Sequence, residues 1–544
     1  MSQNAAVYSR GSTQALIGVL LLGLFLNTFA IDWGIPNIHS WNPDDIAPAK
    51  PLRVVQTYTH GWDKYPFLQS WIDFVAFAPL LFYWSINGTF QPGCESNIET
   101  CFRDPYGQVS ILLILSRLIS ALMAAGAVYW TYRISLLAFQ DRLAAVLGAL
   151  VLTCSNVFVF SAHVGTVDVP YLFWFTWSIY HYLRIVETNQ TKNYIAFGFL
   201  SACALATKEQ VVGAYLIIGI VIYVFHVRRM LDNIQTMDIR SVMKVHMNIR
   251  LVGLVVLLFF TYGLINNVFF NWNGYVKHFT HWVGTAAAGI TPYAKSELGY
   301  TGLLKEFVIH VKAGMSDPLM LLGLAGALYG LSQNVKGALL LIITGISYYI
   351  FTIQSVQYSL IRFGLPVVVL LAIFGGVLGA RFCRVQSSWR WFCFPAIILI
   401  LSYGLLKSVN VVLVMRNDSR YLTERWLINN VARTTQIGVL SVPTYLPRFG
   451  LLGYEVDRIP RESASVEYVE KLKPQYLVVT SKYYSGFRGK QKEFVDALFS
   501  GRLNYRRVWD YKYESPLKSI VGDWYISGFV NPRITVFKHT AISP

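Results

Sequence analysis

Long apolar segments recur along this chain of 544 residues and constrain its fold more than any other feature. A helix needs ~20 mostly apolar residues to cross the hydrocarbon core of a bilayer. By this rule we expect about eleven membrane helices, in the ranges 14–32, 109–130, 143–162, 169–186, 194–208, 211–227, 251–270, 317–333, 337–353, 361–380 and 390–415. The stretch 71–86 is shorter and flanked by polar sequence, so we interpret it as an amphipathic helix on the membrane surface.

Composition and charge agree with a multi-pass membrane protein. Only 14% of the residues are charged, whereas about a quarter are charged in soluble domains. The formal net charge of +17 comes from Lys and Arg that cluster between the apolar runs, where they set orientation and do not indicate a nucleic-acid partner. With a cytoplasmic amino terminus, every predicted inner loop carries basic residues. We therefore expect an integral protein of the plasma or inner membrane, or of the ER membrane in a eukaryote.

An odd number of crossings places residues 416–544 on the outer side as a second domain. This tail is polar and alternates strand-like and helix-like patterns, which predicts a small extracytoplasmic α/β domain. The expected strands are 436–442, 476–480, 524–526 and 533–538, and the expected helices are 422–431, 465–472 and 490–498. The first domain, 1–415, includes an outside loop at 33–108. No Gly-rich phosphate loop occurs, which argues against a nucleotide-driven pump.

The six cysteines show no metal-ligand spacing. Cys94 and Cys101 share the first outside loop, and we expect a disulfide between them if that loop faces an oxidising compartment.

Ionisable residues gather at the predicted outer ends of the helices. Charged groups at the rim of a bilayer are costly, so clustering on one side indicates a cavity open to that side. The set comprises Asp44, Asp45, Arg117, His163, Asp168, Lys208, Glu209, Lys277, His278, His281 and Arg362.

Most of these residues also have a purely structural interpretation. Asp168 stands where a helix begins, two residues before a proline, and taken alone it is an ordinary helix start. Lys208 fits a side chain that snorkels from a helix end, and Arg362 fits an interfacial anchor. Asp44 and Asp45 follow Asn-Pro and fit a simple turn.

Arg117 and the pair of His278 and His281 also have alternative interpretations. Arg117 lies about two turns inside a predicted span, where a guanidinium needs a partner or a water-filled site. His278 and His281 have the spacing of metal ligands on one helical face, yet the sequence supplies no third ligand, so a metal site is disfavoured. The participation of a divalent metal in the chemistry is left open.

Taken together, the charged residues have a chemical logic. Lys208 and Arg362, with Arg117 assisting, are cations suited to holding a phosphate, whereas Asp44 or Asp45 can act as a base toward a hydroxyl. These are the two halves of group transfer from a phosphate-activated donor. A donor that approaches from within the membrane carries a lipid tail.

The same positions resemble the GT-C glycosyltransferases, in particular the group of dolichyl-phosphate-mannose–protein mannosyltransferases and aminoarabinose transferases. The resemblance rests on short motifs in a matching order: Asn42-Pro43-Asp44-Asp45 in the first outside loop, Lys64-Tyr65-Pro66, the segment from His163 to Pro170, Ala206-Thr207-Lys208-Glu209, and the segment from Ile361 to Pro366. Phe67 replaces the second proline of the Tyr-Pro-Pro stretch typical of that group. The likeness covers the whole membrane part, and the tail is much less diagnostic.

This resemblance implies an inverting transferase with a GT-C type membrane domain, a polyprenyl-phosphate sugar as donor and no tightly bound cofactor. The roles carry over by position: Asp44 as the base and Asp45 as its support, Asp168 as an orienting group, Lys208 and Arg362 at the leaving phosphate, Arg117 as a cation that keeps the acids ionised, and Glu209 and Tyr65 among the substrate-binding residues. The acceptor stays open between protein, lipid and polysaccharide.

Two other functions compete with a transferase. A secondary transporter or flippase of a lipid-linked saccharide would also need a charged cavity, but the sequence has neither an internal repeat nor a matching pair of broken helices. A membrane anchor for a binding tail would not need eleven crossings. We therefore rank the transferase first and the transporter second.

Overall fold

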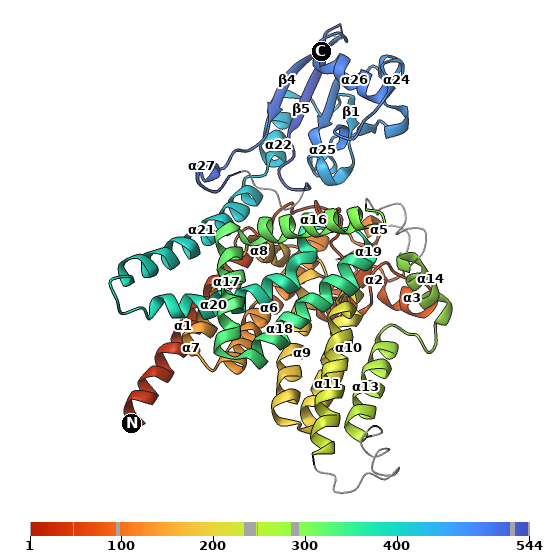
Figure 1. Ribbon diagram of the computed structural model, residues 1–544. Helices are drawn as coiled ribbons and strands as arrows, with labels where there is room; N and C mark the ends of the chain where they lie inside the picture. Colours follow the sequence, from red (N-terminus) through yellow and green to blue (C-terminus); the bar gives the residue numbers. More distant parts are fainter. Residues whose placement is uncertain are drawn as a thin grey trace. The chain divides into compact units, whose positions relative to one another are not determined.

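The computed structural model of the protein describes residues 2–46, 48–93, 98–232, 246, 248–283, 293–522 and 528–541. The described chain forms two compact units, each of which is assembled from separate parts of the sequence (Figure 1). The helical unit comprises Met1–Ile31, Ile46–Phe82 and Leu115–Ser408, and the sheet unit comprises Asp32–Asp45, Tyr83–Ile114 and Val409–Pro544. The sheet unit thus contains the tail together with two pieces of the predicted first outside loop.

Helices make up nearly all of the helical unit. In chain order the elements are α1 (Ser2–Thr28), α2 (Ala49–Leu52), α3 (Val54–His60), α4 (Leu68–Ile86), α6 (Pro105–Phe139), α7 (Arg142–Thr153), α8 (Asn156–His163), α9 (Asp168–Thr188), α10 (Thr191–Thr207), η1 (Glu209–Val211), α11 (Val212–Leu231), α13 (Ile249–Ile265), α14 (Trp272–Val283), α16 (Glu297–Met315), α17 (Asp317–Gln333), α18 (Val335–Tyr348), η2 (Tyr349–Ile353), α19 (Gln354–Val356), η3 (Ile361–Gly364), α20 (Leu365–Cys383) and α21 (Arg390–Arg416). Helices α4, α6 and α21 each continue from one unit into the other.

The chain is an integral membrane protein, but the predicted number of eleven crossings is not confirmed. Among the described residues, six helices are long and apolar enough to span a membrane, or up to eight if each of two bent pairs counts as one span. Helices α9 and α10 are not among them. Their sequences contain polar and aromatic residues, and most of their side chains are buried against other helices rather than exposed.

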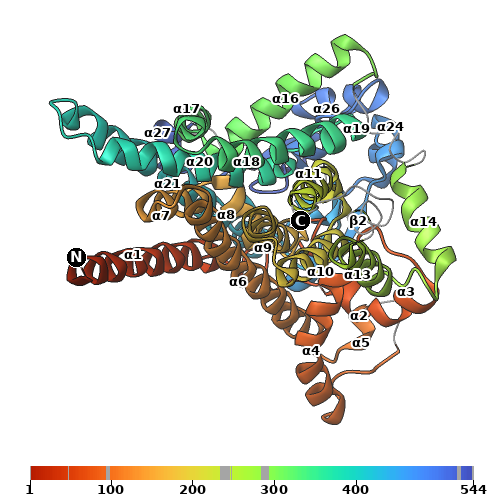
Figure 2. The same ribbon diagram turned by 60° about the horizontal axis from the view of Figure 1, so that its bottom comes forward.

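Glycine allows the tightest helix contacts. Helix α20 packs against both α7 and α17, and α10 packs between α9 and α13 (Figure 2). At Gly376 of α20, an added Cβ would overlap the carbonyl oxygen of Ala144 and the backbone of Gly148 on α7. At Gly326 of α17 it would overlap the carbonyl of Phe374. Small residues of this kind let the backbones of membrane helices approach closely.

The sheet unit is built on five strands in the order β2-β1-β3-β5-β4. Strand β1 (Ile437–Leu440) pairs in parallel with β2 (Val456–Arg458) and β3 (Tyr476–Thr480), whereas β5 (Ile534–His539) pairs antiparallel with β3 and β4 (Tyr505–Tyr511). The other elements of this unit are α5 (Ile98–Cys101), α22 (Ser419–Asn430), η4 (Pro443–Tyr445), α23 (Phe449–Leu452), η5 (Arg461–Ser463), α24 (Val466–Leu472), α25 (Ser481–Tyr484), α26 (Lys490–Phe499) and α27 (Lys518–Val521).

Both faces of this sheet are covered. Successive residues of a strand point to opposite faces, and in β3 Leu477 and Val479 join one hydrophobic cluster while Tyr476 and Val478 join the other. The first cluster includes Phe494 of α26 and the second includes Leu427 of α22. The predicted fold class, a helical multi-pass membrane protein with a C-terminal α/β domain, is confirmed.

Several local predictions can be compared with this unit. The strands predicted at 436–442, 476–480 and 533–538 and all three tail helices are present. The strand predicted at 524–526 lies outside the described residues, and β2 and β4 were not predicted. Cys101 is disulfide-bonded, whereas Cys94, its predicted partner, lies outside the described residues.

Candidate active site

A trio of charged side chains, two of them buried and the third, Arg362, partly exposed, lies where three helix ends meet in the helical unit. Asp168 begins α9, Lys208 follows the last residue of α10, and Arg362 lies in η3 immediately before α20. The Lys208 Nζ donates a hydrogen bond of 2.5 Å to the Asp168 carboxylate, and the Arg362 Nε lies 3.9 Å from the other carboxylate oxygen. The structure therefore brings together three residues that lie far apart in the sequence.

Burial argues against the purely structural interpretations of Asp168 and Lys208, whereas Arg362 is partly exposed. Asp168 is 3% exposed and Lys208 is 9% exposed, so Lys208 does not extend to the membrane surface. The Asp168 carboxylate accepts from Lys208, and no side-chain cap is formed at the start of α9. Two cations share one carboxylate, so with all three groups ionised the trio carries one net positive charge.

Aromatic rings surround the Lys208 ammonium group. The Nζ lies 5.3 Å from the ring centre of Tyr171 and 5.1 Å from that of Phe363. Ring faces attract a cation without neutralising it. The low-dielectric surroundings strengthen electrostatic interactions at this point, so the trio is suited to stabilise an anion.

A second polar group links the residue after Lys208 to α14. The His278 Nε2 lies 2.6 Å from the Glu209 carboxylate, and the Nδ1 lies 2.7 Å from the Asp63 carbonyl oxygen. The Tyr262 hydroxyl donates to the same Glu209 oxygen at 2.8 Å. Burial lowers the pKa of His278, but its hydrogen bond and charge interaction with Glu209 outweigh burial, so the pKa is raised overall. Both ring nitrogens face acceptors, a geometry that favours the doubly protonated ring, in agreement with the raised pKa of His278.

Tyr65 is held by the first outside loop. Its backbone N–H donates to the Asp63 carboxylate at 3.0 Å, and the Lys50 Nζ pairs with the same carboxylate at 2.8 Å. The Lys50 ammonium also lies 4.4 Å from the centre of the Tyr65 ring. Since Asp63 also contacts His278 through its carbonyl, Tyr65 and Glu209, both predicted to bind substrate, belong to one connected group.

The metal-like spacing of His278 and His281 does not produce a metal site in the described part of the chain. Both ring nitrogens of His278 are engaged with Glu209 and Asp63. The ring of His281 packs 5.3 Å from that of Trp62. Over the residues that the structure describes, no group of three or more His, Cys, Asp and Glu is arranged to hold a metal ion.

Arg117 and a neighbouring acid are buried where α6 passes α4. The Arg117 Nη1 donates to the Ile31 carbonyl at 2.7 Å. Asp73 of α4 accepts from Gln69 at 2.9 Å and from Ser116 at 2.8 Å, and burial, opposed by these two hydrogen bonds, raises its pKa to about 7. Sequence reasoning did not include Asp73 among the candidates, although a lone acid within an apolar run is a recognisable signal.

The acidic pair lies in a compact turn of the sheet unit. The two Asp45 carboxylate oxygens accept from Asn42 Nδ2 at 2.9 Å and from Ser40 Oγ at 2.6 Å, and the Asp44 N–H donates to Asn42 Oδ1 at 3.3 Å. The turn interpretation therefore describes this backbone correctly. Asp45 supports the turn, while the convergence of Asp44 with Lys208 and Arg362 stays a prediction.

The fold is that of a polytopic membrane protein, and Asp168, Lys208 and Arg362 form a charged cluster within its helical unit. The family model described as "Dolichyl-phosphate-mannose-protein mannosyltransferase" matches residues 103–272. This segment includes Asp168 and Lys208 but covers less than half of the chain. The resemblance inferred from the sequence is confirmed there. No curated protein sequence matches the chain.

Solved structures of three glycosyltransferases were also found to be similar. ArnT from Cupriavidus metallidurans bound to undecaprenyl phosphate is 13% identical, with a TM-score of 0.45 over 97% of this chain and 98% of that one. The archaeal oligosaccharyltransferase AglB from Archaeoglobus fulgidus, in complex with an inhibitory peptide and a dolichol-phosphate, is 12% identical, with a TM-score of 0.46 over 94% and 81%. The Pmt1-Pmt2 complex of S. cerevisiae bound to the sugar donor is 17% identical, with a TM-score of 0.34 over 48% and 34%.

Proposed function

We propose that this protein is an inverting glycosyltransferase that moves a sugar from a polyprenyl-phosphate donor to a hydroxyl acceptor on the outer face of the membrane. The observation that carries the proposal is the charged trio of Asp168, Lys208 and Arg362, with two cations on one carboxylate. The mannosyltransferase family model supports the same class of donor, because its match includes two of these three residues.

The chemistry explains why an excess of positive charge is needed. The acceptor oxygen attacks the anomeric carbon, a new C–O bond forms, and the bond from that carbon to the phosphate oxygen breaks. The phosphate changes from a diester to a monoester that leaves with the lipid and carries more negative charge than before. Lys208 and Arg362 stabilise this developing charge, which lowers the barrier because the interaction is stronger in the transition state than in the ground state.

Two carboxylates take different parts in this mechanism. Asp44 accepts the proton of the acceptor hydroxyl as general base. Asp168 keeps its carboxylate between the two cations and so orients them toward the phosphate. Asp45 holds the turn that presents Asp44, through the hydrogen bonds from Ser40 and Asn42.

The direct test is donor consumption by the purified protein in lipid nanodiscs. We expect one member of a panel of radiolabelled polyprenyl-phosphate sugars to lose its sugar to a hydroxyl acceptor. Lys208→Met should reduce this turnover by at least ~100-fold, since removal of one such electrostatic donor typically costs that much. Lys407→Met is the matched control, because Lys407 is a half-buried lysine of the helical unit that donates to a backbone carbonyl and to no carboxylate in the described structure.

Two outcomes would contradict the proposal. No donor in the panel would be consumed, or the donor would cross the membrane of a sealed vesicle with its sugar still attached, as expected of a flippase. Retained turnover in Asp44→Asn would move the general base to another residue.

A further inference from the structure

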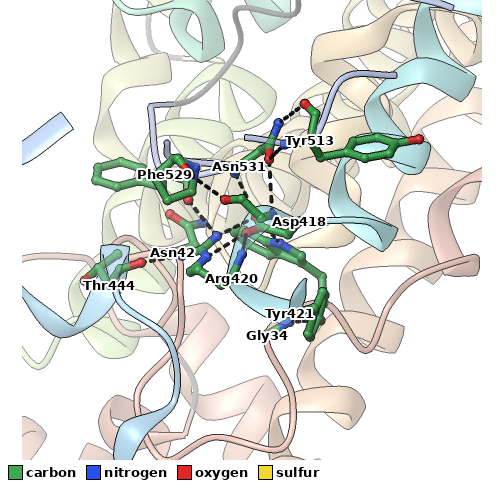
Figure 3. A network of polar contacts seen from close by, with 12 residues as sticks. Gly34, Asn42, Asp418, Arg420, Tyr421, Thr444, Tyr513, Phe529 and Asn531 are labelled. Atoms are coloured by element: carbon green, nitrogen blue, oxygen red, sulfur yellow. Dashed lines mark hydrogen bonds and ion pairs between the residues drawn. The ribbon is translucent and has the colours of Figure 1, made fainter. Parts of the chain in front are cut away.

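We infer that Arg420 is a positioning residue: it fixes the acidic loop, residues 32–45, on the first turn of α22 and acts on the reaction through that loop. The inference rests on the proposed function for its kinetic consequence, but its structural basis lies entirely within the sheet unit. The contacts used below either join the acidic loop to the C-terminal tail or lie within the tail (Figure 3).

The guanidinium group of Arg420 makes four hydrogen bonds below the surface. Arg420 and Asp418 are both 0% exposed. The Nε and Nη2 of Arg420 donate to the two carboxylate oxygens of Asp418 at 2.8 and 2.7 Å. The Nη1 donates to the Thr444 carbonyl at 2.5 Å, and Nη2 also donates to the Phe529 carbonyl at 2.8 Å. This planar, branched pattern of donors suits arginine and cannot be reproduced by lysine.

The acidic loop packs onto this ion pair through two tryptophans. The Trp41 ring centre lies 3.7 Å from the Arg420 guanidinium carbon, and that of Trp33 lies 5.4 Å away. The indole N–H of Trp33 donates to the Asp418 carboxylate at 3.1 Å. Both indoles are buried, so the loop is bound through an aromatic contact and a charge-assisted hydrogen bond.

Neighbouring contacts extend the same attachment. The Gly34 N–H donates to the Tyr421 hydroxyl at 2.7 Å. The Arg448 Nη1 lies 3.4 Å from the Pro36 carbonyl, and its guanidinium carbon lies 5.4 Å from the Trp41 ring centre. Backbone atoms along the loop are therefore fixed by side chains of the tail, and the turn that carries Asp44 begins at the residue after Trp41.

Stability alone does not require a buried ion pair at this place. Well-packed apolar residues often replace such a pair without loss of stability, whereas removal of one partner is strongly destabilising. What the pair supplies is a fixed geometry, because Asp418 also accepts from the Asn531 N–H at 2.7 Å and caps α22 through the Arg420 N–H at 3.1 Å. The Asp418 carboxylate thus holds three parts of the unit in a fixed arrangement: the start of α22, the loop before β5 at Asn531, and Trp33 of the acidic loop.

The test compares Arg420→Lys with a matched change in the same unit, Arg533→Lys. Arg533 also pairs with an aspartate through two donors, at 2.9 and 3.1 Å from Asp510, but its side chain is exposed and its partners among the described residues lie outside the acidic loop. Hydrogen exchange of the peptide 32–45 and steady-state turnover are measured on the full-length protein in nanodiscs. We expect Arg420→Lys to accelerate exchange of that peptide by about tenfold and to lower kcat by at least about tenfold, with the donor KM within about twofold of wild type.

Hydrogen exchange and turnover are also measured for the control, Arg533→Lys. Arg533→Lys should leave both quantities unchanged, and the amides of β3 should exchange at the wild-type rate in both variants. Wild-type exchange of the peptide 32–45 in Arg420→Lys, an equal acceleration of β3, or an unchanged kcat despite a loosened loop would each overturn the inference.

If Arg420→Lys does not accumulate, Tyr421→Phe replaces it, because this change removes only the hydroxyl that accepts from Gly34. The same two readouts and the same limits apply. Failure of the proposed function is recognised separately: a wild-type protein that consumes no donor refutes the transferase, while the exchange measurement still reports whether Arg420 holds the loop.

Discussion

Single residues in this protein derive their roles from their partners. Asp168 satisfies the sequence pattern of a helix start, yet its carboxylate accepts from Lys208 and faces Arg362. Asp45 follows the pattern of a turn and does support one. The same kind of side chain thus serves a charged centre in one place and a turn in the other, and the difference depends on distant residues.

The first prediction at this scale concerns the balance of charge around Asp168. Asp168→Asn leaves the buried Lys208 and the partly exposed Arg362 without their carboxylate and should destabilise the protein by about 3–5 kcal/mol. Adding Lys208→Met should recover part of this loss, because one uncompensated cation is then removed. Thermal unfolding of both variants in one detergent measures the coupling. Strictly additive losses would show that the two side chains are energetically independent.

His278 gives a prediction of pH dependence. Its pKa is raised in the folded protein, so the stabilisation from its pair with Glu209 is complete below the ordinary value of about 6.5 and is lost as the pH rises through the raised value. The difference in Tm between wild type and His278→Gln should therefore be largest near pH 6 and should shrink toward pH 9. A difference that grows with pH would contradict the protonated state.

Asp73 also lowers the stability as the pH rises, but through the cost of burying its ionised carboxylate rather than through the loss of a favourable pair. Burial raises its pKa to about 7, so keeping the carboxyl in the folded protein becomes increasingly unfavourable as the pH rises from about 4 through 7. Asp73→Asn retains polar partners for Gln69 and Ser116 and should be more stable than wild type at pH 8. At pH 4 the two should be nearly equal. Comparison of Tm at these two pH values tests the prediction, and Asp73→Leu, which leaves both partners unsatisfied, should be destabilised at both.

At the scale of the element, close backbone contact controls how the helices pack. Gly376 on α20 meets Ala144 and Gly148 of α7 with no space for a side chain. Gly376→Ala should therefore lower stability by about 1–3 kcal/mol through overpacking. Gly219→Ala on α11 is the matched control, since an added Cβ there has nothing within 4 Å, and it should be neutral or slightly stabilising. Equal Tm values for the two variants would contradict the packing argument.

Elements also show what could be predicted from the sequence. Strand β3 and helix α26 follow from local patterns of five to ten residues, and both lie where predicted. Strand β2 has only three residues at a partly exposed edge, and β4 carries Arg506 and Arg507 within it, so neither shows a clear alternation. Helices α9 and α10 were predicted as spans because of their apolar content; they do not reach the length and hydropathy expected of a span, and their crossing of the membrane stays a prediction.

For the whole molecule, contacts between distant segments limited the prediction. The ionisable residues of the candidate active site could be selected because charge is rare near the apolar segments. The division into units could not be predicted, because residues 32–45 and 83–114 group with the tail through tertiary contacts rather than through any local pattern. The role of Arg420 could not be predicted for the same reason, because in the sequence it is one basic residue in a polar tail.

The bond between Trp33 and Asp418 also has a consequence for how the protein is made. The two residues are separated by 385 positions, and at a synthesis rate of about 5–20 residues per second the second appears roughly 20–80 s after the first. During that interval Trp33 and Trp41 have been synthesised, but the residues that surround them in the folded protein have not. Trp33 and Trp41 therefore remain without their final contacts during synthesis, until the last quarter of the polypeptide has been translated.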